Sequence, residues 1–426
     1  MQVKIFPSKI SGELNAPASK SSMQRACAAA LLHTGITEIK NQGTSNDDKT
    51  ALNIISQLGA VITLKGEILC IKSYGFPKGF NAADKIIHCG ESGLSVRMFT
   101  PIAALWEQKI ILKGEGSLTS RPMDFFDKIL PQLGVQIKSD NGRLPLEIEG
   151  PLEPADISVD GSLSSQFLTG LLFAFGASVQ HPVTISVNDL KSKPYIDLTL
   201  DVMKHFGYNV INQNFQQFTI SKKNEDVDSV INYTVEGDWS SASFLLVAGA
   251  IAGSVRVSGL DEKSSQADKA IIEVLRDCGA DVIISKNFIQ VSKASLKAFT
   301  FDATHCPDLF PPLVALAVYC KGDSVIKGTH RLAAKESNRA ETLQEVFGLM
   351  GIEILLQNDE MIIKGGGPLK GTVIFSHNDH RIAMAGAVAA IGARGCITIT
   401  HADAIDKSYP GFYDDLQKIG ASLEAV

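Results

Sequence analysis

The sequence lacks several features that mark whole classes of protein. Its 40 Lys and Arg residues are outnumbered by 46 Asp and Glu, for a net charge of -6 at pH 7. A general nucleic-acid binder would carry a basic surplus instead. The seven Cys residues are scattered without a CxxC pair, which is typical of free thiols in a reducing compartment. We therefore expect no nucleic-acid partner and a cytoplasmic location.

Long apolar segments are also missing. Residues 1–6 read as a short strand rather than a signal peptide, because no long apolar region follows them. The longest apolar runs, 167–177 and 382–391, are too short to span a bilayer. Both are apolar on nearly every side, which predicts buried helices. We therefore expect no membrane partner.

The motifs of several large enzyme classes are absent too. There is no GxSxG elbow, P-loop or GxGxxG fingerprint, and no Ser-His-Asp order, so hydrolase, kinase and nicotinamide-dependent activities lose their usual support. His377 and His380 lie three residues apart, but no HExxH motif or third ligand accompanies them. We therefore expect no metal.

What the chain does contain is a repeat. Amphipathic segments end in a glycine and run into a strand-like stretch. Glycine suits this position because it takes the left-handed conformation at a helix end at little cost. Apolar helices, each followed by another strand-like run, lie between these stops. The pattern predicts an α/β module of about 70 residues, present six times. A chain of 426 residues favours two domains, hence three modules each, with a boundary near residues 233–238. The six stops, 69–75 residues apart, are at Gly59, Gly134, Gly207, Gly279, Gly351 and Gly420.

Positive side chains gather where these helices are predicted to begin. Helix starts normally favour acids because of the helix dipole, so cations there indicate an anionic ligand. Any single one of these stretches could equally be an ordinary cap, turn or solvated charged face. Ser164, Ser165 and Gln166 add uncharged donors, and Asp308 and Glu336 are carboxylates that could orient or deprotonate a hydroxyl. The cations are Lys20, Arg25, Arg97, Arg121, Lys335, Arg339, Arg381 and Lys407.

Taken together, these stretches resemble the 5-enolpyruvylshikimate-3-phosphate synthase family, the 3-phosphoshikimate 1-carboxyvinyltransferases of the shikimate pathway. The resemblance covers essentially the whole chain. It is carried by SKSSMQR at 19–25, DGSLSSQFLTGLL at 160–172, SKPYID at 192–197, GDWSSAS at 237–243, KESNR at 335–339, NDHRIAM at 378–384 and DKSYPGF at 406–412.

The resemblance implies an α/β fold of two similar domains. Each would contain three βαβαββ repeats, in the inside-out α/β barrel of enolpyruvyl transferases, with the active site in the interdomain cleft. The first domain would span 19–236, on the shikimate 3-phosphate side. The second would be discontinuous, with 1–18 joined to 237–426.

The resemblance also implies the reaction. The enolpyruvyl group of phosphoenolpyruvate is transferred to the 5-hydroxyl of shikimate 3-phosphate through a tetrahedral intermediate, with release of phosphate and with no metal or organic cofactor. Both partners are small molecules, and the protein would be a monomer. Glu336 is the first choice for proton transfer, with Asp308 and Lys20 as rivals, and His380 completes the implied catalytic set.

Two substrate sites follow from the same resemblance. Shikimate 3-phosphate would bind Lys20, Ser21, Arg25, Ser164, Ser165, Gln166, Ser192, Tyr195, Asp308 and Lys335. Phosphoenolpyruvate would bind Lys20, Gly93, Arg121, Gln166, Arg339, Arg381 and Lys407.

Two other functions stay open on the sequence alone. One is a UDP-N-acetylglucosamine enolpyruvyl transferase, which has the same donor, and the other is a non-catalytic anion-binding repeat protein. The chain also departs from the family pattern. It has Glu91-Ser92-Gly93-Leu94 where Asn-Ala-Gly-Thr is common, and Arg331 where some members have Asn. Gly93 matches the small residue of glyphosate-sensitive members, but Leu94 leaves sensitivity undecided.

Overall fold

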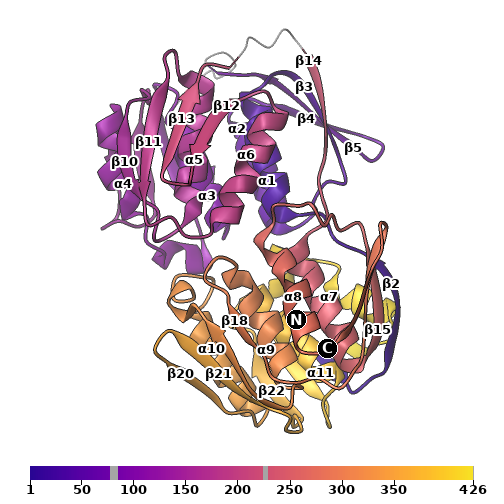
Figure 1. Cartoon of the computed structure of the whole chain (residues 1–426). Coiled ribbons are helices and arrows are strands. Elements are labelled where there is room, and N and C mark those ends of the chain that lie inside the picture. Colours follow the sequence, from indigo (N-terminus) through magenta and orange to yellow (C-terminus); the bar gives the residue numbers. More distant parts are fainter. Residues whose placement is uncertain (77–84, 224–228, 426) are drawn as a thin grey trace. The chain divides into compact units, whose positions relative to one another are not determined.

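The computed structural model describes residues 1–76, 85–223 and 229–425. By its internal contacts the chain divides into two compact units. Unit 1 comprises Met1–Pro17 and Glu236–Val426, and unit 2 comprises Ala18–Val235. Figure 1 colours the chain along its sequence, so the indigo N-terminal strands can be followed into the yellow and orange part of unit 1.

The described strands form six four-stranded sheets with one common order. In the sheet β6-β7-β9-β8, the first two strands are parallel and the remaining neighbours are antiparallel. Helix α3 (Gly93–Ala103) connects the parallel pair, and α4 (Asp124–Ile129) precedes the closing hairpin. This is the predicted βαβαββ module. Its strands are β6 (Lys85–His88), β7 (Lys109–Lys113), β8 (Gln136–Lys138) and β9 (Leu146–Glu149).

Unit 2 contains two further sheets of the same order. One is β14 (Ser229–Thr234), β3 (Thr34–Lys40), β5 (Ile68–Tyr74) and β4 (Val61–Lys65). The other is β10 (Ile157–Asp160), β11 (Val183–Asn188), β13 (Gln217–Ser221) and β12 (Asn209–Gln213).

Unit 1 contains the other three sheets. The first is β2 (Ile10–Asn15), β15 (Gly253–Ser258), β17 (Phe288–Ser292) and β16 (Asp281–Ile284). The second is β18 (Thr300–Asp302), β19 (Gly322–Lys327), β21 (Glu360–Gly365) and β20 (Ile354–Gln357). The third is β22 (Thr372–Phe375), β23 (Ile397–Thr400), β1 (Gln2–Phe6) and β24 (Ser422–Ala425).

Two strands pair away from the helix that follows them in the chain. Strand β2 runs into α1 (Lys20–Leu32), yet it pairs with β15 of unit 1 in parallel, Ile10 opposite Gly253. Strand β14 runs into α7 (Trp239–Ala252), yet it pairs with β3 of unit 2, Val230 opposite Ile36. Each strand thus completes a module whose helices come from another part of the sequence.

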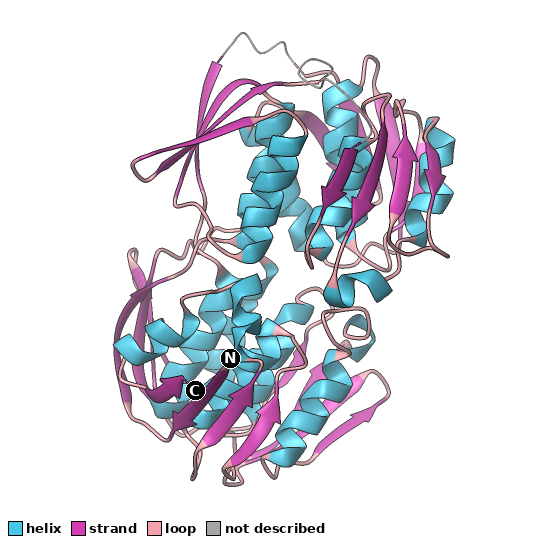
Figure 2. Cartoon of the chain, turned by 180° about the vertical axis from the view of Figure 1, so that it is seen from behind, coloured by secondary structure: helices cyan, strands magenta, loops and turns pink. Residues whose placement is uncertain are grey.

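Three apolar helices form the core of each unit, and Figure 2 shows the strands lying outside the helices. Unit 2 buries α1, α3 and α5 (Ser165–Ser178), and unit 1 buries α7, α9 (Phe310–Ala317) and α11 (His380–Ile391). Helices α5 and α11 confirm the two predicted buried helices. The amphipathic helices are α2 (Asn46–Gln57), α4, α6 (Lys193–His205), α8 (Ile271–Asp277), α10 (Arg339–Leu349) and α12 (Phe412–Lys418).

The glycine stops are confirmed as left-handed helix ends. All six have a positive φ, from +80° at Gly134 to +104° at Gly59. A side chain with a Cβ would be strained at this angle, so glycine lets each amphipathic segment turn at once into its strand. Short 3₁₀ turns complete the connections: η1 (Gly116–Ser120), η2 (Leu130–Leu133), η3 (Ala267–Ala270), η4 (Pro307–Leu309), η5 (Thr329–Arg331) and η6 (Ala402–Lys407).

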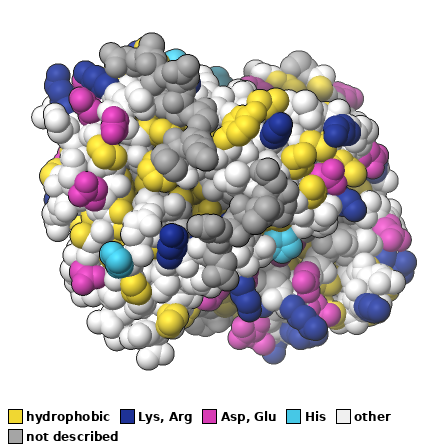
Figure 3. Space-filling view, turned by 90° about the horizontal axis from the view of Figure 1, so that it is seen from above, with side chains coloured by type: hydrophobic (Ala, Val, Ile, Leu, Met, Phe, Trp, Pro, Cys, Tyr) yellow, Lys and Arg dark blue, Asp and Glu magenta, His cyan; other side chains and the backbone are white. Residues whose placement is uncertain are grey.

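The surface carries charges of both signs. On the face in Figure 3, basic, acidic and hydrophobic side chains are interspersed. Candidate anion sites must therefore come from local groups of cations, as the net charge of -6 already required.

Candidate active site

In unit 2, the predicted anion site begins at the first turn of α1. Ser19 is the N-cap, and its side chain accepts a hydrogen bond from the backbone N–H of Ser22 at 3.3 Å. The helix has no acid in its first turn, so Lys20 and Ser21 stand at a positive helix end. Lys20 Nζ forms an ion pair of 2.9 Å with Asp47 of α2, and both side chains are largely buried.

Arg25 holds the beginning of α6 beside α1. Its side chain is 1% exposed, and its guanidinium donates to Thr199 Oγ1 at 2.9 Å and to the carbonyl oxygens of Ser21 and Tyr195 at 2.8 and 3.2 Å. Because these partners lie on both helices, Arg25 brings Ser21 and the predicted residue Tyr195 to one place. Ser192 is the N-cap of α6 and has a positive φ of 53°.

A second group in unit 2 surrounds Gly93 at the start of α3. A Cβ atom on Gly93 would lie 2.8 Å from Nη1 of Arg121 and 3.4 Å from Nη1 of Arg97. Arg121 donates to Ser117 Oγ at 3.0 Å. The sequence predicted that Arg121 opens a helix, but it lies between η1 and α4. The guanidinium groups of Arg121 and Arg97 thus lie against Gly93, where a side chain would collide with them.

Gln166 joins this group through Arg97. Arg97 Nη1 donates to Gln166 Oε1 at 2.9 Å, and the Arg97 guanidinium stacks on the Phe167 ring at 5.2 Å. Because the amide oxygen is the acceptor of this bond, the amide NH₂ remains the group that can donate to a ligand. Ser164 caps α5 by accepting from Gln166 N at 3.3 Å, and Ser165 is the first residue of α5.

In unit 1, three cations surround one carboxylate. Asp308, in η4, accepts from Lys335 Nζ at 3.2 Å, from Arg339 Nη1 at 2.7 Å and from Arg381 Nη2 at 3.3 Å. Glu336 forms a further ion pair with Arg339 Nη2. Three predicted cations from two separate segments, the stretch that leads into α10 and the first turn of α11, therefore meet at Asp308.

Asp379 completes this cluster and was not among the predicted residues. It is fully buried, and Arg339 donates to it twice, from Nε at 2.7 Å and from Nη2 at 3.2 Å. It also caps α11 by accepting from the backbone N–H of Arg381 at 3.0 Å, and it accepts from Ser337 Oγ at 3.1 Å. In the sequence NDHRIAM, an Asp directly before a predicted helix is a typical N-cap, and this signal could have indicated Asp379.

The cluster shifts the ionisation of its members. Burial by itself would raise the pKa of Asp308, but Arg381, Lys335 and Arg339 hold it well below its usual range. Burial lowers the pKa of Lys335, and Arg339 lowers it further, although Asp308 opposes the shift. Burial also acts against the charge on Arg339, yet Asp379, Glu336 and Asp308 together raise its pKa. Asp308 is therefore a carboxylate at neutral pH.

The cations of the unit 1 cluster are balanced by acids of the protein itself. In unit 1, three carboxylates (Asp308, Glu336 and Asp379) face three cations (Lys335, Arg339 and Arg381). Cations at helix starts predict an external anion, but here the protein's own acids supply that charge. An anionic ligand would compete with these acids for the same donors.

The remaining predicted residues lie beside this cluster or near it. His380 is 1% exposed, with Nδ1 3.9 Å from Asp379 Oδ1, and it starts α11. Lys407 Nζ donates to the Asn378 carbonyl at 2.6 Å, which joins it to the loop before α11. Lys407 ends η6, so the expectation that it opens the last amphipathic helix is wrong. Arg331 ends η5.

Glu91, the acid that departs from the family pattern, faces a glycine. A Cβ atom on Gly116 would lie 2.3 Å from Glu91 Oε2, and Gly116 has a positive φ of 54°. The carboxylate therefore lies against the η1 turn that leads to Arg121. Sequence reasoning missed the pairing of Asp47 with Lys20 and of Asp379 with Arg339, because partners far apart in the chain leave no local pattern. It also missed Ser117, which lies four residues before Arg121.

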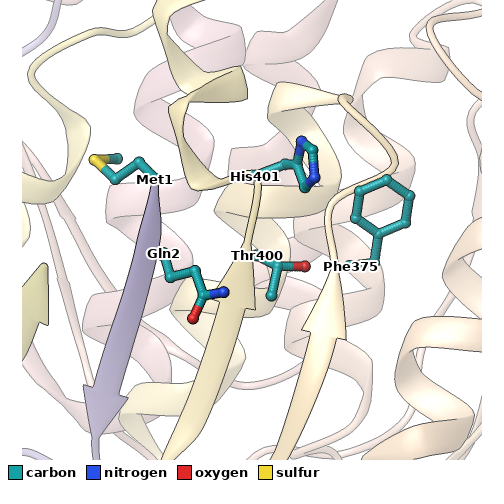
Figure 4. A pocket seen from close by; sticks show the side chains of 5 residues that line it. All are labelled: Met1, Gln2, Phe375, Thr400 and His401. Atoms are coloured by element: carbon teal, nitrogen blue, oxygen red, sulfur yellow. The ribbon is translucent and has the colours of Figure 1, made fainter. Parts of the chain in front are cut away.

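One surface pocket of unit 1 lies apart from these residues. It has a volume of about 380 Å³ and is lined by Met1, Gln2, Phe375, Thr400 and His401, which lie on strands β1, β22 and β23 or next to their ends. Figure 4 shows these five side chains. Among the described residues that line it there is no Lys or Arg, so it offers none of the side-chain cations that the predicted anion site requires. Across residues 1–76, 85–223 and 229–425, no group of three His, Cys, Asp or Glu could hold a metal ion.

Comparisons with known proteins address the identity of the chain. The family described as "EPSP synthase (3-phosphoshikimate 1-carboxyvinyltransferase)" matches residues 6–416. A 3-phosphoshikimate 1-carboxyvinyltransferase of Clostridium novyi is 36% identical over 429 residues, covering 99% of this chain and 98% of its own, and one of Clostridium botulinum is 36% identical over 425 residues at the same coverage.

Solved structures agree with the sequence comparisons. An EPSP synthase from Acinetobacter baumannii superposes with a TM-score of 0.84 at 25% identity, covering 99% of both chains. The enolpyruvyl transferase NikO from Streptomyces tendae shares the fold at 16% identity, with a TM-score of 0.78 over 99% of this chain. In the part of the chain that the structure describes, none of the helices is both long and apolar enough to cross a membrane. By sequence over nearly its full length and by fold, this chain belongs to the EPSP synthase family.

Proposed function

We propose that this chain transfers the enolpyruvyl group of phosphoenolpyruvate to the 5-hydroxyl of shikimate 3-phosphate and releases phosphate. Family membership supplies the reaction class. The observation that carries the proposal is the cluster in unit 1, where Lys335, Arg339 and Arg381 converge on the ionised Asp308. Such a group can bind a carboxylate or phosphate with its cations while its carboxylate accepts a hydrogen bond from a substrate hydroxyl.

The proposed mechanism has two steps. In the first, the 5-hydroxyl gives its proton to a carboxylate of the site and its oxygen bonds to the central enol carbon, while an acid of the site protonates the methylene carbon, which gives a tetrahedral ketal phosphate. In the second, a proton leaves the new methyl group, the double bond forms again and phosphate departs. Asp308 orients the hydroxyl, and Glu336 is the first choice for the proton at carbon, with Lys20, Asp308 and His380 as the other proposed catalytic groups.

The substrate assignment follows the family resemblance. Arg339, Arg381 and Lys407 of unit 1 and Arg121, Gly93 and Gln166 of unit 2 are proposed to bind phosphoenolpyruvate. For shikimate 3-phosphate we propose Ser21, Arg25, Ser164, Ser165, Gln166, Ser192 and Tyr195 of unit 2, with Asp308 and Lys335, and Lys20 serves both substrates. We further propose that residues 19–236 and the discontinuous 1–18 plus 237–426 are the two domains of a cytoplasmic monomer.

The test is release of phosphate from phosphoenolpyruvate with either acceptor. We expect release with shikimate 3-phosphate and none with UDP-N-acetylglucosamine. The Lys20→Met variant should lose turnover, because it removes the cation at the start of α1. Lys364→Met is the matched control, since Lys364 pairs with Asp323 on the exposed surface of unit 1. Absence of release with shikimate 3-phosphate contradicts the proposal, and release with UDP-N-acetylglucosamine would favour the alternative enzyme.

A further inference from the structure

The start of α2 contains a buried acid next to the Lys20 ion pair. Ser45 and Asp48 form a capping box, in which Asp48 N donates to Ser45 Oγ at 3.2 Å and Asp48 Oδ2 accepts from Ser45 N at 3.2 Å and from Ser45 Oγ at 2.6 Å. Asp48 is 1% exposed. Its other oxygen, Oδ1, has no hydrogen-bond partner among residues 1–76, 85–223 and 229–425.

A capping acid does not normally need this degree of burial. The usual carboxylate at the third position of a capping box sits at the solvent-facing helix end, where water solvates its second oxygen. Asp48 is instead buried, and the acid that pairs with Lys20 is its neighbour Asp47, at 2.9 Å. Two acids thus lie beside one cation of the proposed substrate site, and only one of them touches it.

The groups around Asp48 determine its ionisation. Burial raises its pKa to about 6, against the hydrogen bonds from Ser45 and the charge of Lys20, while Asp47 raises it further. Cys27 faces it from α1, and the pKa of that thiol is raised by burial and then by Asp48. The other elements packed on α2 direct their charges elsewhere: Arg97 of α3 contacts Gln166 and Phe167.

The far end of α2 is also accounted for. Lys85 of β6 donates to the Gln57 carbonyl at 2.6 Å, which is the last residue of α2 and thus the opposite end from Asp48. Lys65 of β4 is exposed. Lys20 is therefore the cation whose charge Asp48 feels, and by reciprocity a change at Lys20 acts on Asp48.

We propose that Asp48 is a positioning residue that links anion binding at Lys20 to the uptake of a proton. An anion bound at Lys20 places negative charge beside a buried carboxyl and so favours its neutral form. Conversely, a neutral Asp48 removes one of the two acids that compete with the anion for Lys20. This inference rests on the proposed function only in taking the start of α1 as part of the substrate site.

The sign of the effect follows from linkage. Binding raises the pKa of Asp48 above its value of about 6 in the free protein. Anion affinity is therefore highest below pH 6, falls as the pH rises through the interval between the free and bound values, and is constant above it. A shift of half a unit to one unit corresponds to a change in affinity of about three- to tenfold.

The experiment measures sulfate binding to the full chain between pH 5 and pH 8 by calorimetry. Sulfate is the probe because its charge is constant over this range, whereas inorganic phosphate takes up a proton within it. In the wild type, the affinity should fall about three- to tenfold with rising pH. Asp48→Asn keeps an acceptor for Ser45 but cannot ionise, so its affinity should stay flat near the acid value of the wild type.

Two further measurements make the outcome decisive. Asp124→Asn, the same substitution at a solvent-exposed side chain in the first turn of α4, should keep the wild-type pH profile. Calorimetry of the wild type in buffers of different ionisation enthalpy should show net proton uptake between pH 6 and pH 7. A wild-type pH profile in Asp48→Asn, or no proton uptake in the wild type, overturns the inference. Sulfate binding requires no turnover, so a failed phosphate-release assay would reject the proposed enzyme and leave this result intact.

Discussion

Asp379→Asn is the substitution that most directly tests the unit 1 cluster. Arg339 and Asp379 are 1% and 0% exposed, so solvent screens their ion pair very little. Asparagine retains an oxygen that can cap α11, but it removes the charge that accepts two hydrogen bonds from Arg339. The variant thus isolates the charge from the cap.

The magnitude follows from what remains around Arg339. Removing one partner of a buried ion pair typically costs about 3–5 kcal/mol, because the other charge is left without compensation. Arg339 still contacts Asp308 and Glu336, which compensate part of its charge, so we place the loss below that range, at about 2–3 kcal/mol. Asp379→Ala should cost about 1 kcal/mol more, since it also removes the helix cap.

Urea denaturation followed by circular dichroism measures this loss, and phosphate release measures its effect on the site. We expect a lower transition midpoint and a raised KM for phosphoenolpyruvate, because Arg339 is no longer fixed. Asp323→Asn, in the exposed pair with Lys364, is the control and should leave both unchanged. A midpoint and KM equal to the wild-type values in Asp379→Asn would refute the idea that this buried charge fixes Arg339.

Three other outcomes are expected. Gly93→Ala places a Cβ 2.8 Å from Arg121 Nη1, so the guanidinium must move; steady-state kinetics should give a KM for phosphoenolpyruvate raised about tenfold, the equivalent of 1.4 kcal/mol, and an unchanged KM would contradict this geometry. The lowered pKa of Asp308 contributes stability that is present above its unfolded value of about 3.9 and is lost as the pH falls through the lower native value; acid unfolding of Asp308→Asn should lack this component, and a curve parallel to the wild type would exclude it. Burial raises the pKa of the Cys89 thiol to about 12, whereas Cys396 is only half-buried; iodoacetamide and peptide mass spectrometry should find Cys396 alkylated first, and early labelling of Cys89 would contradict its burial.

The local features of this protein were determined by its sequence. The six glycine stops, the Ser19 cap of α1 and the apolar helices α5 and α11 depend on conformations and burial that neighbouring residues specify, so periodicity and cap residues predicted them. The motifs around Lys20, Lys335 and Arg381 likewise indicated the family.

Only the tertiary structure decided which distant groups meet. Alternating strand patterns do not specify a partner, so the pairing of β2 with β15 and of β14 with β3 could not be read from them. The same holds for charges. Asp47 beside Lys20 and Asp379 beside Arg339 are determined by how helices pack, because an ion pair between residues far apart in the chain requires no spacing or local pattern.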